Sequence, residues 1–111
     1  MSEDKIYHYA FIEEILQGKY TEKNVRIAGC LADQDPVHSK FTLMHGDSSI
    51  DCLYTDSNKP QITGDFLQVC GYVRRMVPQP IILLHFCRNI NGVNEDDYDF
   101  AISKFKQFVH D

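Results

Sequence analysis

A glycine inside an alternating strand is the feature that most constrains this chain. In Asn24–Leu31, the apolar side chains of Val25, Ile27 and Leu31 alternate with the other residues, which is typical of a β-strand with one buried face. Gly29 falls on the buried side, where a missing side chain indicates a bend, a bulge or a close backbone approach. A small closed barrel requires such a strand at a corner. We therefore predict that this segment is the first barrel strand and pairs along both edges.

Four later segments are predicted as strands of the same barrel. Lys40–His45 and Ser49–Tyr54 alternate in polarity on either side of a tight turn, so they form a hairpin. Phe66–Arg75 alternates as well, and its apolar face belongs in the core. Pro80–Cys87 is apolar at nearly every position, and we expect it to be covered on both faces.

Helices are expected near the two ends of the chain. An extended lead-in is followed by a short helix that ends near Gln17, and Asn94 is a good N-cap for a helix over Glu95–His110. Ala32–Ser39 is predicted as a loop, and Thr55–Thr63 as a crossover without a strong helix signal. The element order fits a mainly β, five-stranded OB-fold, which is a Greek-key barrel, with one short N-terminal and one C-terminal helix.

Length and charge restrict the protein class. The 111 residues make one domain, 1–111, with a barrel over about 24–87 and the helix over about 95–110. A net charge of −5 argues against a stand-alone nucleic-acid binder, because phosphate binding is driven by Lys and Arg. No apolar run approaches a membrane span, and the first residues lack a signal pattern. We therefore expect an intracellular protein that does not bind membranes.

Catalytic and metal chemistry find little support in the sequence. The five histidines are scattered without close His or Glu partners, and no nucleophile, base and orienting group can be named together. The four cysteines each fall in a predicted strand without a close second cysteine, whereas zinc sites favour close pairs. We expect reduced, metal-free thiols, no cofactor and no catalytic residues.

One aromatic and basic group is a candidate nucleic-acid surface. OB-folds bind single strands by stacking bases on aromatic rings beside a positive groove. The candidates are Tyr72, Arg74 and Arg75, together with Arg26 and Lys40. Arg26 and Tyr72 also occupy outward positions in their strands, so an ordinary solvent-exposed face is the alternative.

The C-terminal helix carries more apolar surface than docking on one side requires. One stripe at helical spacing is expected to pack on the barrel: Tyr98, Ile102, Phe105 and Val109. A second set is expected to meet a partner: Phe100, Ala101, Lys104 and Phe108. Ile102, Phe105 and Val109 are included with that set as candidate partner-binding residues. The alternative is that Phe100 and Phe108 pack on the barrel or are simply exposed.

With these residues placed, the chain resembles the smallest, Ten-type OB-fold subunit of the telomere-capping CST complex. The resemblance covers roughly residues 11–109 and rests on the order and spacing of four segments: Val25–Leu31, Phe41–His45, Gly64–Val73 and Arg88–Asn94. The small subunit of replication protein A has a similar plan. The segment Gly64–Gly71 and the link Arg88–Asn94 are closer to the Ten-type pattern.

The resemblance implies a non-enzymatic subunit that forms a heterodimer with a Stn-type OB-fold protein and works with a larger CST subunit. Such a pair binds and protects single-stranded telomeric DNA and regulates its replication, in the nucleus at the telomeric region of chromosomes. The DNA contact of this chain would be weak or indirect. The small subunit of replication protein A, another single-stranded DNA-binding assembly, and an OB-fold accessory or small-ligand module without nucleic acid stay open as alternatives.

Overall fold

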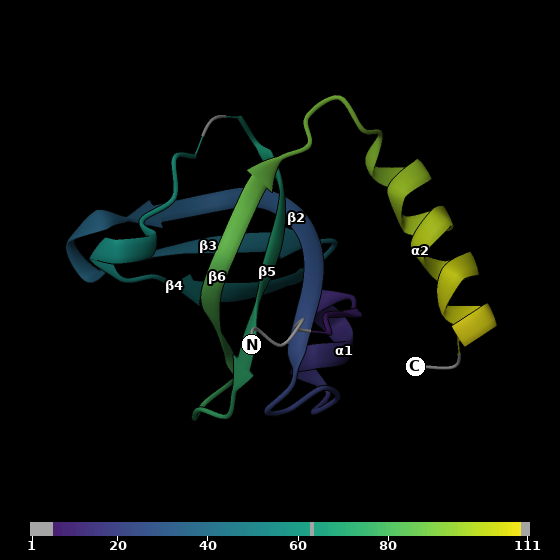
Figure 1. Cartoon of the computed structure of the whole chain (residues 1–111), viewed down its shortest axis with the longest axis horizontal. Coiled ribbons are helices and arrows are strands. Elements are labelled where there is room, and N and C mark those ends of the chain that lie inside the picture. Colours follow the sequence, from purple (N-terminus) through teal and green to yellow (C-terminus); the bar gives the residue numbers. More distant parts are fainter. Residues whose placement is uncertain (1–5, 63, 110–111) are drawn as a thin grey trace, which may run out of the picture.

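The strand that contains Gly29 pairs along both edges, and this closes the sheet into a barrel. In the computed structural model, which describes residues 6–62 and 64–109, β2 (Asn24–Asp35) pairs antiparallel with β3 (Lys40–His45) and with β5 (Phe66–Arg74). The circuit runs β2-β3-β4-β6-β5 and back to β2, with β4 (Ser48–Leu53) parallel to β6 (Ile81–Asn89). This is the predicted OB-fold barrel (Figure 1).

Gly29 lies where two backbones come close together. A Cβ atom on Gly29 would be 2.9 Å from the carbonyl oxygen of Met44 and 3.2 Å from Cβ of Leu43, both on β3. Backbone atoms of a paired strand move little, so a side chain does not fit here. The glycine predicted at the bend therefore allows the close approach that the sequence pattern indicated.

β2 is longer than predicted and takes up much of the expected loop Ala32–Ser39. A bulge between Leu31 and Asp33 shifts the pairing register, after which the strand continues along β3 to Asp35. Only a short 3-10 turn over Pro36–His38 remains, because proline has no N–H to donate to a further ladder bond. The bulge is the reason that the loop prediction was wrong.

The N-terminal segment covers one end of the barrel. α1 (Ile12–Leu16) buries Ile12 and Ile15 completely, and its C-cap is Gln17, as the sequence predicted. The short β1 (His8–Tyr9) pairs parallel with β2, where only an extended lead-in was expected.

All five barrel strands and α1 contribute to one apolar core. Its completely buried side chains include Val25, Ile27, Phe41, Leu43, Ile50, Cys52, Leu67, Val69, Val73 and Ile82. Leu67, Val69 and Val73 are the face of β5 that the alternation assigned to the core. All four cysteines are free thiols, as expected.

β6 is covered on one face rather than on both. Ile82 and Leu84 are buried, whereas the ring of Phe86 is 51% exposed. An extra residue, His85, lies between the Gly71–Leu84 and Cys70–Phe86 pairs and shifts the register. The uniform apolar pattern of this strand therefore overstated its burial.

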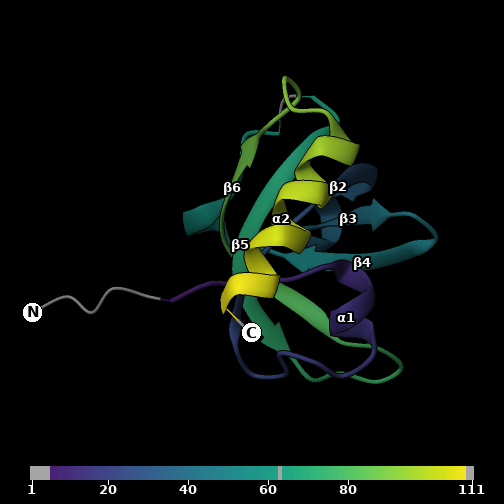
Figure 2. The ribbon, with the colours of Figure 1, turned by 90° about the vertical axis from the view of Figure 1, so that its right-hand side faces the viewer.

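β5 is the strand that is covered on both faces. Its outward residues Phe66, Gln68 and Cys70 are buried along with the core face. Tyr98 of α2 (Glu95–Val109) contacts Phe66 and Gln68, and α2 lies along this side of the barrel (Figure 2). Among the described residues, neither α1 nor α2 combines the length and the apolar character needed to cross a membrane.

Gly29→Ala is expected to lower the free energy of unfolding by about 1–3 kcal/mol, since the added methyl group must displace β3. Gly92→Ala is the matched control, because a Cβ there meets no atom within 4 Å, and a change within about 0.5 kcal/mol is expected. Denaturant unfolding of both variants measures the difference. If the two variants are half unfolded at the same denaturant concentration, the close approach at Gly29 does not constrain the residue there.

Candidate partner and nucleic-acid interfaces

α2 begins where the sequence predicted. The side-chain oxygen of Asn94 accepts the backbone N–H of Asp97 at 3.1 Å, which makes Asn94 the N-cap. Glu95, Asp96 and Asp97 occupy the first turn, near the positive end of the helix dipole. The predicted last residue, His110, and the side chain of Val109 lie outside what the structure describes.

The inner face of α2 packs on β5 and β1 through few apolar contacts. Ile102 is 8% exposed, and the ring of Tyr98 meets the edge of Phe66 with centroids 6.0 Å apart. Phe105 contacts Tyr9 edge-on at 5.0 Å but is 43% exposed. The expected apolar stripe is therefore present at Tyr98 and Ile102 and opens toward solvent at Phe105.

Polar contacts hold the C-terminal half of α2 on the rest of the protein. The ammonium of Lys106 donates to the carbonyl oxygen of Tyr9 at 2.7 Å and to the hydroxyl of Tyr20 at 2.6 Å. It also lies 3.3 Å from a carboxylate oxygen of Glu14 on α1. Burial would lower the pKa of Lys106, but the hydrogen bond to Tyr20 and the charge of Glu14 outweigh burial and raise it. Lys106 thus stays charged and links α2 to α1 and β1.

His45 on β3 joins both helices. Its Nδ1 is 2.8 Å from Glu13 on α1, and its Nε2 is 2.8 Å from Asp99 on α2. Burial would lower the pKa of His45, but hydrogen bonds to Asp99 and Glu13 raise it above its usual value. When the ring is protonated, it donates to both carboxylates. The ring also stacks on Phe11, with the ring centres 5.5 Å apart.

A thiol contact lies beside this histidine. Sγ of Cys30 donates to Oε2 of Glu95 at 3.0 Å, and this hydrogen bond, with burial, raises the pKa of Cys30 to about 11. Sequence reasoning missed the group because Cys30, His45 and Glu95 come from three separate elements. The one available signal was that His45 lies at the end of a predicted strand, on the same face as the apolar residues Phe41 and Leu43.

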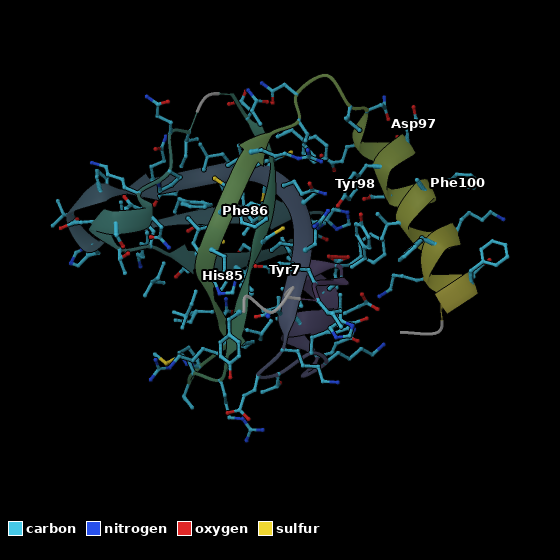
Figure 3. The ribbon with its side chains drawn as sticks, in the orientation of Figure 1. Tyr7, His85, Phe86, Asp97, Tyr98 and Phe100 are labelled. Atoms are coloured by element: carbon cyan, nitrogen blue, oxygen red, sulfur yellow. The ribbon has the colours of Figure 1, made fainter. Side chains whose placement is uncertain are left out.

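The outer face of α2 is exposed. Phe100 is 66% and Phe108 83% exposed, and Ala101 and Lys104 are exposed beside them. The ammonium of Lys104 lies 5.4 Å from the centre of the Phe100 ring. Figure 3 shows Tyr98 on the barrel side of α2 and Phe100 on the far side. Within the described chain, this second apolar face does not pack on the barrel.

Three of the nucleic-acid candidates lie together. Tyr72, Arg74 and Arg75 line one hollow of about 430 Å³ with Glu22 and Leu83, at the end of β5. The hollow faces solvent where β5 leads into the turn before β6. In OB-folds, this turn and one face of the β-sheet bind oligonucleotides.

Lys40 lies in the same row of the sheet as Tyr72 but three strands away. Successive pairings connect Tyr72 with Leu83, Leu83 with Leu53, and Leu53 with Lys40. At roughly 4.8 Å per strand the row is about 14 Å long. The ammonium of Lys40 is 3.6 Å from Asp51, which reduces its free charge.

Arg26 does not line the hollow, although it lies on β2 diagonally opposite Tyr72 of β5. Its guanidinium lies 5.5 Å from the ring centre of Tyr9 and 6.0 Å from that of Tyr7, on the side of the barrel covered by β1. Its Nε is buried without a hydrogen-bond partner among the described residues. Of the five predicted residues, Tyr72, Arg74 and Arg75 line the hollow, and Arg26 and Lys40 lie outside it.

Lys106→Ala is expected to lower the free energy of unfolding by about 1.5–3 kcal/mol, because it removes charge-assisted hydrogen bonds to Tyr9 and Tyr20. Lys104→Ala, on the same helix but exposed, should change it by no more than about 0.5 kcal/mol. Denaturant unfolding followed by circular dichroism compares them. The anchoring role of Lys106 is wrong if the two variants unfold alike.

Comparison with known proteins bears on the fold. No protein-family model and no curated protein sequence matches the chain. Among solved structures, a chain of the S. pombe Stn1–Ten1 complex is similar with a TM-score of 0.73 at 21% identity, and the match covers 95% of this chain and 96% of that one. The S. pombe telomere capping protein Ten1 gives the same TM-score and identity, with 92% and 99% covered.

A U. maydis replication protein A structure bound to single-stranded DNA is also similar, with a TM-score of 0.68 at 14% identity. The match covers 96% of this chain and 97% of that one. At these identities the likeness establishes the fold. Over nearly its whole length, this chain has the OB-fold with flanking helices found in Ten1.

Proposed function

We propose that this chain is a Ten-type, non-enzymatic subunit of a telomere-capping complex, and that it pairs with a Stn-type OB-fold protein through α2. The observation that carries the proposal is the second apolar face of α2, with Phe100 66% and Phe108 83% exposed. Large apolar side chains exposed on one face of a helix are typical of an interaction site. The similarity to a chain of the S. pombe Stn1–Ten1 complex supports the same partner.

The partner surface consists of the residues on the outer and lateral sides of α2: Phe100, Ala101, Lys104, Phe105 and Phe108. Phe105 belongs to it because its ring is 43% exposed at the border between the barrel and the outer face. Ile102 is only 8% exposed because its side chain packs on the barrel. Its role is therefore to hold α2 in place. Val109 remains a candidate from its helical position alone.

The assembled complex, together with a larger CST subunit, binds and protects single-stranded telomeric DNA and regulates its replication in the nucleus. The hollow of Tyr72, Arg74 and Arg75 is the place where this chain would contribute, through one stacking ring beside two guanidinium groups. With a net charge of −5, its share of the affinity is small.

The second candidate function is the small subunit of replication protein A. It is favoured by the similarity to the U. maydis replication protein A structure, at a TM-score of 0.68. Affinity purification of the tagged chain from its own cells, followed by identification of the copurified protein, separates the two. A Stn-type partner supports the proposal, a replication protein A subunit supports the second candidate, and copurification of neither overturns both.

Phe108→Ala is expected to weaken the heterodimer about thirtyfold, or about 2 kcal/mol, because aromatic side chains buried at an interface dominate its energy. The melting temperature of the isolated chain should not change, since Phe108 is 83% exposed. Val37→Ala, an exposed apolar residue in the turn before β3, is the control and should bind as the unaltered chain does. Titration calorimetry against the partner subunit measures both. An unchanged affinity for Phe108→Ala would remove the outer face of α2 from the interface.

The double variant Arg74→Glu and Arg75→Glu should weaken binding of single-stranded DNA by the assembled complex and reduce its salt slope by roughly one per lost phosphate contact. Lys19→Glu with Lys59→Glu makes the same charge change at two exposed lysines that do not line the hollow. Fluorescence anisotropy at several salt concentrations compares them. If both double variants lose the same affinity, the effect is one of net charge, and the hollow is not a DNA contact.

A further inference from the structure

One cluster of metal-ligating side chains joins α2 to β3 and has no part in the interfaces proposed above. A ring nitrogen of His45 and carboxylate oxygens of Glu95 and Asp99 all lie within 4.8 Å of one another. Glu95 and Asp99 are four residues apart on α2, so they share one side of the helix. All three side chains are half-buried, which shields the cluster and leaves it open to a small ion.

The donor set is that of zinc and its neighbours among the transition metals. Zn²⁺ binds imidazole nitrogen and carboxylate oxygen at about 2.0–2.2 Å, which places the ligand atoms of a tetrahedral site roughly 3.3–3.6 Å apart. The atoms here lie between 2.8 Å, for His45 Nε2 and Asp99 Oδ2, and the upper bound of 4.8 Å. Small side-chain rotations therefore suffice to admit the ion. An imidazole ligand selects zinc over magnesium or calcium.

The surroundings of the cluster orient its ligands. Glu13 on α1 lies 2.8 Å from His45 Nδ1, the arrangement that fixes the ring and directs the other nitrogen to a metal. The stacked ring of Phe11 restrains the imidazole further, at 5.5 Å. On the other side, the thiol of Cys30 holds Oε2 of Glu95 at 3.0 Å. The ligands thus come from β3 and α2, and their supports from α1 and β2.

We propose that a zinc-class divalent cation binds His45 Nε2, Glu95 and Asp99, with water completing its coordination. The ion takes the place of the direct contact between His45 and Asp99 and ties the first turns of α2 to the barrel. This differs from the expectation of no metal site. That expectation considered ligands close in sequence, whereas these residues are brought together only by the docking of α2.

Titration of zinc into the chelator-treated full chain, followed by calorimetry, tests the proposal. We expect one equivalent to bind and the melting temperature to rise, because a ligand of the folded state stabilises it. Asp99→Asn and Glu95→Gln should each weaken binding at least about tenfold, and Glu13→Gln should do so through the support of His45. Asp97→Asn, an exposed carboxylate on the same turn, is the matched control and should keep full affinity.

Cobalt provides a readout that does not depend on stability. Co²⁺ bound at the cluster gives visible absorption bands that should be lost in the combined Glu95→Gln and Asp99→Asn variant, while circular dichroism shows that α2 is retained. The proposal is overturned if one equivalent of zinc does not bind. It is also overturned if the combined variant binds zinc as tightly as the unaltered chain, or if His38→Ala at the exposed His38–Asp35 pair abolishes binding.

Discussion

Every other part of this structure depends on the pairing of β2 along both of its edges. One edge carries β3 through the close approach at Gly29, and the other carries β5 from residue 24 to residue 30. Because both edges are occupied, the sheet closes and its interior is sealed from water. α2 also depends on this closure, because it docks on side chains of three strands that the closed barrel holds together: Phe66, His45 and Tyr9.

α2 is attached to the barrel in a different way from the strands. Among the described residues, its only buried apolar side chain is Ile102. Beside two aromatic edge contacts, made by Tyr98 and Phe105, much of the attachment is polar and includes the contacts of Lys106 and His45. Charged and hydrogen-bonded contacts fix the orientation of a helix more than they add to the free energy of folding. The helix is therefore held at a defined angle with its second apolar face outward, as the proposed contact with a partner requires.

The barrel could be predicted from the sequence because each strand carries its own local signal. Alternation marked β2 to β5, and Asn94 marked the start of α2 by the chemistry of its cap. The bulges after Leu31 and at His85 could not be predicted, since a register shift depends on the partner strand. The position of Arg26 outside the hollow that Tyr72 lines could not be predicted, for a related reason. The rings of Tyr7 and Tyr9 cover Arg26 through the short β1, which has no sequence signature of its own.

The pairing of β2 with β5 also has a consequence for how the chain folds. Asn24 must find Tyr72, and the strands that complete the barrel, β5 and β6, come late in the sequence. Loop-closure entropy has to be overcome before these distant contacts return any free energy, so such topologies fold in milliseconds to seconds rather than microseconds. During synthesis, β2 and the β3–β4 hairpin leave the ribosome with one edge of β2 still unpaired. The barrel therefore cannot close until β5 has been made, because β5 supplies the partner for the second edge of β2.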